Sequence, residues 1–171
     1  KITVSSVGMA RYFAEDGWKD ITIAFPVNVR QIGEIKEVTQ KVNLGLLVLD
    51  ADTIETLGEN ITLPVTLWIK IDVGTHRTGI ASEDTKTINA IVEKIKLYPQ
   101  LHFEGFLAHA GHSYQGRSVA EVQQIYDQSL AIMMDLKSQY KSQFPTIKIS
   151  LGDTPGSSMV RIFGPVDELR P

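Results

Sequence analysis

The sequence contains no cysteine, and this absence excludes several kinds of chemistry at once. Disulfide bonds, thiolate catalysis and cysteine-ligated zinc or iron–sulfur centres cannot be built from this chain. The lack of cysteine does not decide the redox compartment. With no signal peptide or transit segment recognised at the start, we expect a cytoplasmic protein.

The sequence also lacks an excess of positive charge and any long apolar or low-complexity run. Its formal net charge is −3 and its pI is about 5.8, so it has no excess of positive charge with which to bind nucleic acid or an anionic membrane. Of the 171 residues, 43% are hydrophobic and 22% are charged, which is typical of one globular domain with a sizeable core. We therefore expect a small-molecule partner.

Three common catalytic and nucleotide-binding motifs are missing. There is no GxGxxG segment, and the only stretch that approaches a P-loop, GENITLP, has no lysine followed by Ser or Thr. Serine, histidine and aspartate are all present, but no GxSxG elbow exists to expose a nucleophilic serine. Nucleotide cofactors and triad hydrolysis are therefore not supported.

Strand-like and helix-like segments alternate along the chain. The β-branched and aliphatic runs predict six strands, at residues 2–6, 21–27, 44–50, 65–72, 103–109 and 147–151. Apolar residues three and four apart predict helices at residues 8–16, 29–42, 53–59, 83–98 and 119–140. Ser82 and Ser118 stand where the N-caps of the last two helices are expected.

This alternation predicts an α/β fold with a parallel sheet, because parallel neighbours need a long crossover connection. Two architectures are compatible with six strands. One is an open, doubly wound sheet, for which this length is sufficient. The other is a (β/α)₈ barrel with about six of its eight βα units present, for which this length is too short. In both, functional loops follow the carboxyl ends of the strands.

Polar residues gather at these strand ends. They read Ser5 and Ser6, Pro26 and Asn28, Asp50, DVGTHR, HAGHSY and GDTPGSS. The last loop, residues 152–158, offers backbone N–H groups and the hydroxyls of Thr154, Ser157 and Ser158 to an anion such as phosphate. An ordinary Asp-Thr-Pro-Gly turn explains the same residues equally well.

Two other interpretations of these ends remain open on the residues alone. His109 and His112, with Asp153, form a conceivable metal pair, although a spacing of three on a strand end does not place side chains on one face. Arg77 is either a functional cation or a surface arginine paired with Asp72.

Four segments carry a resemblance to a known family. KIDVGTHRTGI, FEGFLAHAGHSY, ISLGDTPGSS and VDELRP occur in order on successive strand ends. In this order and spacing the chain resembles the alanine racemase N-terminal domain family, the pyridoxal-phosphate barrels of fold type III. Within it, the chain most resembles the D-threonine aldolase and D-serine dehydratase branch. The resemblance implies an incomplete (β/α)₈ TIM-type barrel over residues 1–171.

The resemblance assigns cofactor-binding roles to six residues. It implies that Arg77 reaches the phenolic oxygen of pyridoxal 5'-phosphate, where a fixed cation favours the deprotonated oxygen. It implies that His109 packs against the cofactor ring and that Tyr114 lies near it. The loop after the seventh barrel strand binds the phosphate in this family, which assigns Gly152, Asp153 and Thr154. His112 is left facing substrate. Lys70 matches a position that carries a modified lysine in some racemases, and we assign it no role.

The chain departs from the family in what it lacks. The lysine that forms the Schiff base with the cofactor belongs to the first barrel strand, and this chain begins at the match to the second. The eighth strand and the C-terminal β domain, which holds the divalent metal ligands in this branch, are expected beyond Pro171. We therefore expect no catalytic residue in this chain and no activity from these 171 residues alone.

The expected activity is that of the full-length parent. It is a pyridoxal-phosphate-dependent lyase that acts on a small D-amino acid, of the D-threonine aldolase or D-serine dehydratase type, and the resemblance implies a homodimer. The alternatives are an amino-acid racemase of the same fold and a non-catalytic pyridoxal-phosphate-binding module. An open-sheet domain that binds another phosphate is the third possibility.

Overall fold

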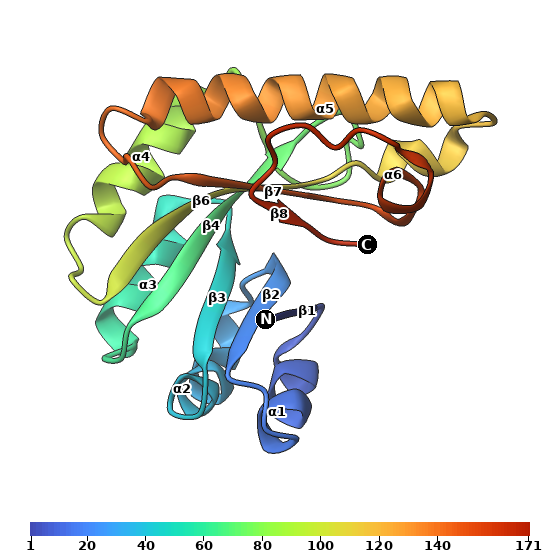
Figure 1. The fold of residues 1–171 in the computed structure, drawn as a ribbon. Coiled ribbons are helices and arrows are strands. Elements are labelled where there is room, and N and C mark those ends of the chain that lie inside the picture. Colours follow the sequence, from blue (N-terminus) through green and yellow to red (C-terminus); the bar gives the residue numbers. More distant parts are fainter. The chain divides into compact units, whose positions relative to one another are not determined.

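The computed structural model describes residues 1–171, in which strands and helices alternate (Figure 1). The strands are β1 (Ile2–Val4), β2 (Asp20–Pro26), β3 (Asn43–Val48), β4 (Val65–Asp72), β5 (Ile80–Ala81), β6 (Leu101–His109), β7 (Lys148–Gly152) and β8 (Glu168–Leu169). The α-helices are α1 (Val7–Glu15), α2 (Ile32–Thr39), α3 (Ala51–Asn60), α4 (Thr85–Ile95), α5 (Val119–Tyr140) and α6 (Thr154–Met159). Two 3₁₀ helices, η1 (Val29–Gln31) and η2 (Gly111–Gln115), complete the secondary structure.

The strand order separates the two predicted architectures. The order is β1-β2-β3-β4-β6-β7-β8, with the short β5 beside β4, so neighbours in the sheet are also neighbours in the sequence. The β1–β2, β2–β3, β3–β4, β6–β7 and β7–β8 pairs are all parallel. A doubly wound open sheet reverses its strand order at a switch point, whereas a (β/α)₈ barrel does not. The chain is therefore an incomplete TIM-type barrel.

Two predicted details were wrong. No strand was expected between residue 151 and Pro171, yet Glu168–Leu169 forms β8 and pairs with Ser150 and Leu151 of β7. The two-residue strand β5 beside β4 was not expected either, so the predicted count of six strands is two short. Ser82 is not the cap of α4, because this helix begins only at Thr85 and the Ser82 hydroxyl bonds instead to Glu83 (2.8 Å).

Four helices begin at a residue whose side chain accepts a hydrogen bond from a backbone N–H three positions later. The caps are Ser6, Asp50, Ser118 and Asp153, with distances of 2.6 to 3.2 Å. Each cap follows closely on the end of a strand or a loop, so it fixes where the chain turns into the helix. The predicted cap at Ser118 is confirmed.

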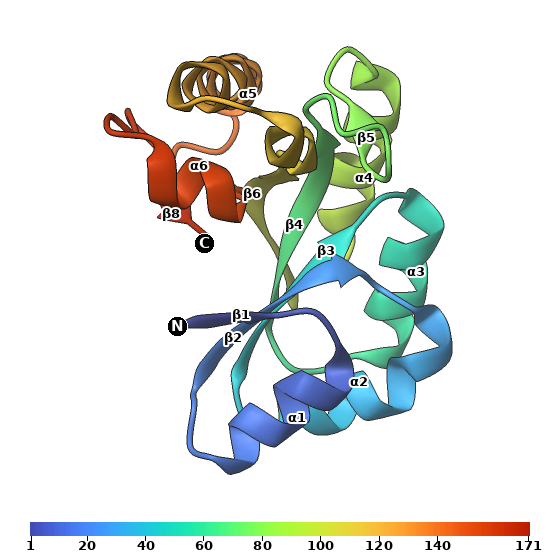
Figure 2. The same cartoon turned by 90° about the vertical axis from the view of Figure 1, so that its right-hand side faces the viewer.

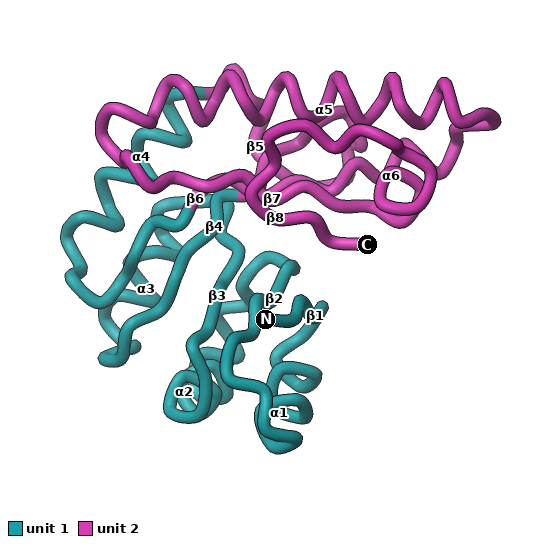
Figure 3. The backbone as a smooth tube through the Cα atoms, in the orientation of Figure 1, with its two compact units in different colours: residues 1–69, 85–104 teal, residues 70–84, 105–171 magenta.

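The chain divides into two compact units, which Figure 3 distinguishes by colour. Unit 1 contains residues 1–69 and 85–104, and its core lies between the strands β1 to β3 and the helices that follow them (Figure 2). In β3, every residue after Asn43 is buried, as a strand covered on both faces requires. Ile54 and Leu57 of α3 and Ile88 and Ile91 of α4 are fully buried, each contributing about 2 kcal/mol.

Unit 2 contains residues 70–84 and 105–171, and α5 is its longest helix. Its buried side chains include Tyr126, Met133 and Leu136. Asp167 joins three parts of this unit, because one carboxylate oxygen accepts hydrogen bonds from Lys137 of α5 (2.5 Å) and from the Ile149 N–H of β7 (2.8 Å). No helix of the chain has the length and apolar character needed to cross a membrane.

Candidate functional site

The segment after β4 is folded around the carboxylate of Asp72. One oxygen of Asp72 accepts hydrogen bonds from the backbone N–H groups of Gly74 (3.0 Å) and His76 (3.1 Å), and the other lies 3.3 Å from His76 Nδ1. Partial burial alone would raise the pKa of Asp72, but these N–H groups and the His76 ring hold it below its usual value. Asp72 therefore pairs with His76 and not with Arg77.

The end of β4 and this segment contribute to a cluster of three cations, Lys70, Arg77 and Arg170. Lys70 is only 4% exposed, and its pKa is lowered to about 8, mainly by burial and then by the charges of Arg170 and Arg77. Asp72 opposes this shift only weakly. Burial likewise lowers the pKa of Arg170, to about 10. The guanidinium of Arg77, by contrast, belongs to an exposed residue.

Arg170 directly follows β8, and its guanidinium is held by residues of three neighbouring strands. Its Nε donates to the Ser150 hydroxyl (2.8 Å), and its terminal nitrogen donates to the Ala108 carbonyl oxygen. The same Ser150 hydroxyl donates to Glu168 (2.9 Å), so the guanidinium is fixed by β6, β7 and β8 together. A guanidinium with these partners remains charged at neutral pH.

His109 lies at the end of β6 beside this cluster. Burial lowers its pKa, and the charges of Lys70, Arg77 and Arg170 lower it further, while the Gly152 backbone partly opposes the shift. The ring is therefore neutral at pH 7, which leaves one of its nitrogens as an acceptor. The centroid of the Tyr114 ring is 6.4 Å away, at an interplanar angle of 37°.

His112 and Asp153 do not join His109 as metal ligands. His112 Nδ1 lies 3.3 Å from the Thr75 hydroxyl, which itself donates to the carbonyl oxygen of His109 (2.9 Å). The Asp153 carboxylate instead accepts hydrogen bonds from the Ser113 hydroxyl and the Gly156 N–H. No group of three or more His, Asp or Glu side chains in the chain is arranged to hold a metal ion.

The loop after β7 is the start of the short helix α6. Asp153 caps this helix through the Gly156 N–H (2.6 Å), accepts a hydrogen bond from Ser113 (2.5 Å) and is only 3% exposed. Its carboxylate would repel a phosphate, so Asp153 shapes the loop and is not suited to contact an anion. A side chain at Gly152 would place its Cβ 2.2 Å from the Arg170 carbonyl oxygen, so only glycine permits this close approach.

The same loop presents donors to a ligand. Tyr114 donates to the Thr154 hydroxyl (3.1 Å), which ties η2 to α6. The Ser157 hydroxyl is buried and has no hydrogen-bond partner, whereas that of Ser158 donates to the Thr154 carbonyl oxygen. A buried hydroxyl without a partner is costly. A phosphate oxygen is the kind of acceptor that Ser157 lacks.

All six residues assigned from the sequence lie in unit 2, and so do Lys70 and Arg170. Arg77 and His109 interact with the cations of the cluster, and Tyr114 and Thr154 interact with each other. Sequence reasoning gave no role to Arg170, although it stands in the segment VDELRP that carries part of the resemblance. The signal that was available is the position of Arg170 directly after Glu168 and Leu169, at the end of a strand.

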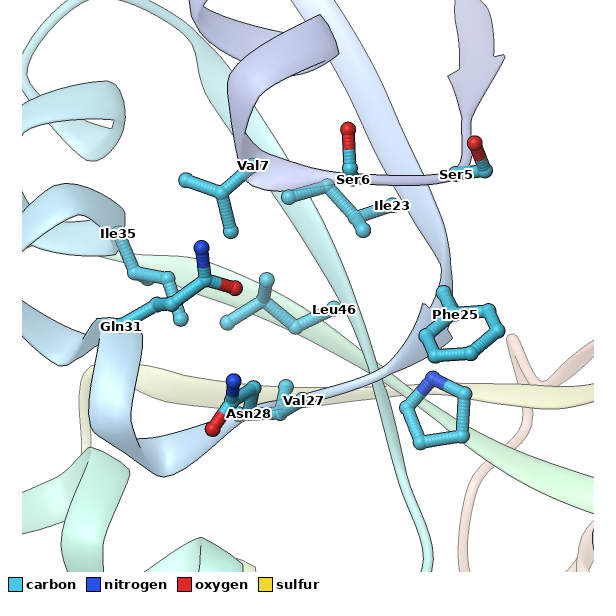
Figure 4. A pocket seen from close by; sticks show the side chains of 11 residues that line it. Ser5, Ser6, Val7, Ile23, Phe25, Val27, Asn28, Gln31, Ile35 and Leu46 are labelled. Atoms are coloured by element: carbon cyan, nitrogen blue, oxygen red, sulfur yellow. The ribbon is translucent and has the colours of Figure 1, made fainter.

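A cavity in unit 1 has a different character. It has a volume of about 220 Å³ and lies at the ends of β1 and β2 (Figure 4). Its wall is mainly apolar, and its polar side chains are those of Ser5, Ser6, Asn28 and Gln31. None of the residues that line it is charged, so it offers no counter-ion for a phosphate and no acid or base.

Comparison with known proteins agrees with these motifs. The family model described as "Alanine racemase, N-terminal domain" matches residues 2–171. The D-serine dehydratase of Schizosaccharomyces pombe is 28% identical over 152 residues, which cover 82% of this chain and 36% of the relative. The D-threo-3-hydroxyaspartate dehydratase of Delftia sp. is 25% identical over 174 residues, covering 99% of this chain and 46% of the relative.

Solved structures show the same fold. That of the Delftia dehydratase has a TM-score of 0.89 at 23% identity, covering 99% of this chain and 46% of the other. The D-threonine aldolase of Filomicrobium marinum has a TM-score of 0.88 at 15% identity, covering 99% of this chain and 47% of the other. The chain spans less than half the length of these relatives.

Proposed function

Because this chain belongs to the alanine racemase N-terminal domain family, we propose that the protein binds pyridoxal 5'-phosphate and acts as a lyase on D-amino acids. The observation that carries the proposal is the group of three cations around His109, namely Lys70, Arg77 and Arg170. Each of them lowers the pKa of His109, and two of them repel Lys70. Lys70 and Arg170 also have lowered pKa values, although Glu168 and Asp153 partly offset the charge of Arg170. A group of like charges with perturbed pKa values is typical of a site for a ligand of the opposite sign.

The residues present fit this cofactor. Pyridoxal phosphate, when bound, supplies an aldehyde for a substrate amine and a conjugated ring that accepts electrons from the amino-acid Cα. Arg77 would stabilise negative charge on the phenolic oxygen, and neutral His109 would offer a flat face to the ring. The Ser157 and Thr154 hydroxyls would donate to the phosphate. Tyr114 and Gly152 would shape the loop that presents them, and Asp153 would cap it.

The choice of a lyase rests on the relatives. The dehydratases of S. pombe and Delftia match most of this chain, and the loops HAGHSY and GDTPGSS resemble those of the aldolase and dehydratase branch. Because the chain spans less than half of these relatives, the proposal places the activity in a longer polypeptide. A divalent metal, the Schiff-base lysine and a homodimer belong to that part of the proposal. We expect the 171 residues alone to bind the cofactor without turnover.

Titration of the protein with pyridoxal phosphate tests the cofactor, read by the change in the visible absorption band. Substrate assays on the full-length protein then test the reaction. Loss of water from D-serine, followed by hydrolysis of the resulting enamine, gives pyruvate and ammonia. Aldol cleavage of D-threonine gives glycine and acetaldehyde, and racemisation gives the L-enantiomer. A saturable absorption change with pyruvate or glycine supports the proposal. Binding with only L-amino acid formed would make the protein a racemase, and binding with no turnover a carrier module.

A further inference from the structure

Thr75 links three parts of unit 2 through one hydroxyl group. It lies in the segment after β4, and its Oγ1 donates to the carbonyl oxygen of His109 at the end of β6 (2.9 Å). The same Oγ1 lies 3.3 Å from Nδ1 of His112 in η2. A hydroxyl group carries a single proton, and a carbonyl oxygen can only accept it. The contact with His112 is therefore a hydrogen bond in which Nδ1 donates and the Thr75 oxygen accepts.

This hydrogen bond decides which nitrogen of His112 exchanges protons. A neutral imidazole has one N–H group and one bare nitrogen, so a proton held on Nδ1 leaves Nε2 bare. Gly74 keeps this nitrogen approachable, because a Cβ at that position would lie 3.3 Å from Nε2 and 3.3 Å from Cε1 of the ring. A longer side chain there would crowd the same edge of the imidazole. Nε2 is thus the proton-accepting atom of His112.

A ligand can reach this ring. His112 is half-buried and lines a cavity of about 310 Å³ between η2 and α5. The other polar side chains that line the cavity are those of Gln115, Glu121, Gln124 and Gln128. Apart from His112, Glu121 is the only titratable side chain among them, and one of its oxygens accepts a hydrogen bond from the Arg117 N–H (2.7 Å). A carboxylate and a bare ring nitrogen in one cavity favour a cation that carries N–H donors.

The substrate class of the proposed function supplies such a cation, because an amino acid carries its amine as an ammonium group at neutral pH. An ammonium group has no lone pair, so it must lose a proton before it can attack an aldehyde. We propose that His112 Nε2 takes this proton from the substrate, and that Thr75 is the positioning residue that keeps Nε2 bare.

This proton transfer needs no oxidant or reductant. One N–H bond of the ammonium group breaks, a new N–H bond forms at Nε2, and the electron pair stays on the substrate amine. The inference rests on the proposed function and adds to it the group of this chain that deprotonates the substrate.

Nitrogen NMR of the protein with isotope-labelled histidine tests the arrangement without any turnover. The chain has four histidines, and His112→Gln identifies the signals of His112 by their loss. At pH 8.5 we expect the proton of His112 on Nδ1 in the wild type and in Thr75→Ser, which keeps the hydroxyl. In Thr75→Val the ring should change mainly to the Nε2–H form, which free histidine prefers in water. Nε2–H in the wild type, or an unchanged ring in Thr75→Val, would overturn the inference.

Activity of the full-length protein on D-amino acids tests the proton transfer. His112→Gln should lower kcat/KM about a hundredfold at pH 7, and Thr75→Val about tenfold, as for the loss or misplacement of a general base. Both defects should shrink at pH 9.5, where much of the substrate amine is already deprotonated in solution and needs no acceptor. Thr75→Ser should restore most of the activity lost in Thr75→Val. His102→Gln, at an exposed histidine near the start of β6, is the control and should leave kcat/KM unchanged.

Cofactor binding separates a failure of this inference from a failure of the proposed function. Quenching of intrinsic fluorescence by pyridoxal phosphate should keep its midpoint in His112→Gln, because the ring acts on the substrate and not on the cofactor. Turnover with equal defects at pH 7 and pH 9.5 would overturn the role of His112 and leave the proposed function in place. A wild-type protein that turns over no D-amino acid would overturn the proposed function, and the role of His112 with it.

Discussion

Ser113 donates a 2.5 Å hydrogen bond to the carboxylate of Asp153, and both side chains are almost entirely buried. Ser113 belongs to η2, which follows β6, and Asp153 caps α6, which follows β7. The pair therefore joins the two strand-end segments that carry Tyr114 and Thr154. Because the Asp153 carboxylate would repel a phosphate, its contribution to a cofactor site is to hold α6 in place.

Ser113→Ala should weaken this arrangement in two measurable ways. The buried carboxylate loses a donor, so we expect the free energy of unfolding in urea to fall by about 1–3 kcal/mol. The affinity for pyridoxal phosphate should fall as well, because α6 is less firmly held. Ser129→Ala is the control, since the buried Ser129 hydroxyl bonds only to the Ile125 carbonyl oxygen within α5. Equal effects of the two substitutions would contradict the role of the Ser113–Asp153 pair.

Arg77→Gln should reduce cofactor affinity and leave stability unchanged. Arg77 is exposed and has no ion pair with Asp72, so its removal costs the fold little. If its guanidinium contacts the phenolic oxygen, its loss should weaken binding about ten- to a hundredfold, as for a charge-assisted hydrogen bond. Fluorescence titration and thermal unfolding measure the two properties. Arg30→Gln, an exposed arginine of η1, should change neither, and an unchanged affinity in Arg77→Gln would argue against the assigned contact.

The sequence predicts the long strands well because each is an apolar run that ends at polar residues. It misses β8, since Glu168 and Leu169 form only two residues of strand with no alternation to detect. That strand exists because Asp167 and Arg170 bind to β7 and to α5. These contacts are long-range and leave no local pattern. The start of α4 was misplaced for a related reason, because Ser82 followed by acidic residues is a local signal of a cap that the chain does not use.

The site was predictable in its residue types and less so in their roles. Arg77 and His109 stand at strand ends, where function is expected in this fold, and both belong to the cation cluster. Asp153 shows what the sequence does not determine. An aspartate in a loop of this kind is the same residue whether it contacts the ligand or caps the helix. Only the hydrogen bonds of Ser113 and Gly156 distinguish the two. The role of Arg170 could not be predicted without knowing that β8 places it beside β6 and β7.

Gly79→Ala should disrupt the segment that carries Arg77. Gly79 has a φ of +135°, which side chains rarely adopt, and a Cβ there would lie 2.5 Å from the Asp72 backbone nitrogen. We expect a loss of at least about 2 kcal/mol in unfolding free energy together with loss of cofactor binding. Gly33→Ala provides the matched control, because nothing lies within 4 Å of its Cβ position in α2. That substitution should be neutral or stabilising by up to about 1 kcal/mol, and similar losses in both variants would contradict the explanation.

Lys70→Met should stabilise the protein at pH 7, in a way that depends on pH. The pKa of Lys70 falls from 10.5 to about 8 on folding, so between these values the unfolded chain binds more protons than the folded one. Stability from this group therefore rises with pH across that window, and its full cost, about 3 kcal/mol at most, is present below about pH 8. Methionine fills a similar volume without a charge.

Urea unfolding of the wild type and of Lys70→Met at pH 7 and pH 9.5 measures this cost. The variant should be more stable at pH 7, and its advantage should shrink at pH 9.5, where most of the wild-type amine is already neutral in the folded state. Exposed Lys36→Met should show no such pH-dependent gain. A gain of equal size at both pH values would mean that methionine packs better, and not that the wild-type protein bears an uncompensated cation. In that case the free-energy cost of burying the Lys70 cation would no longer support a binding site for an anion.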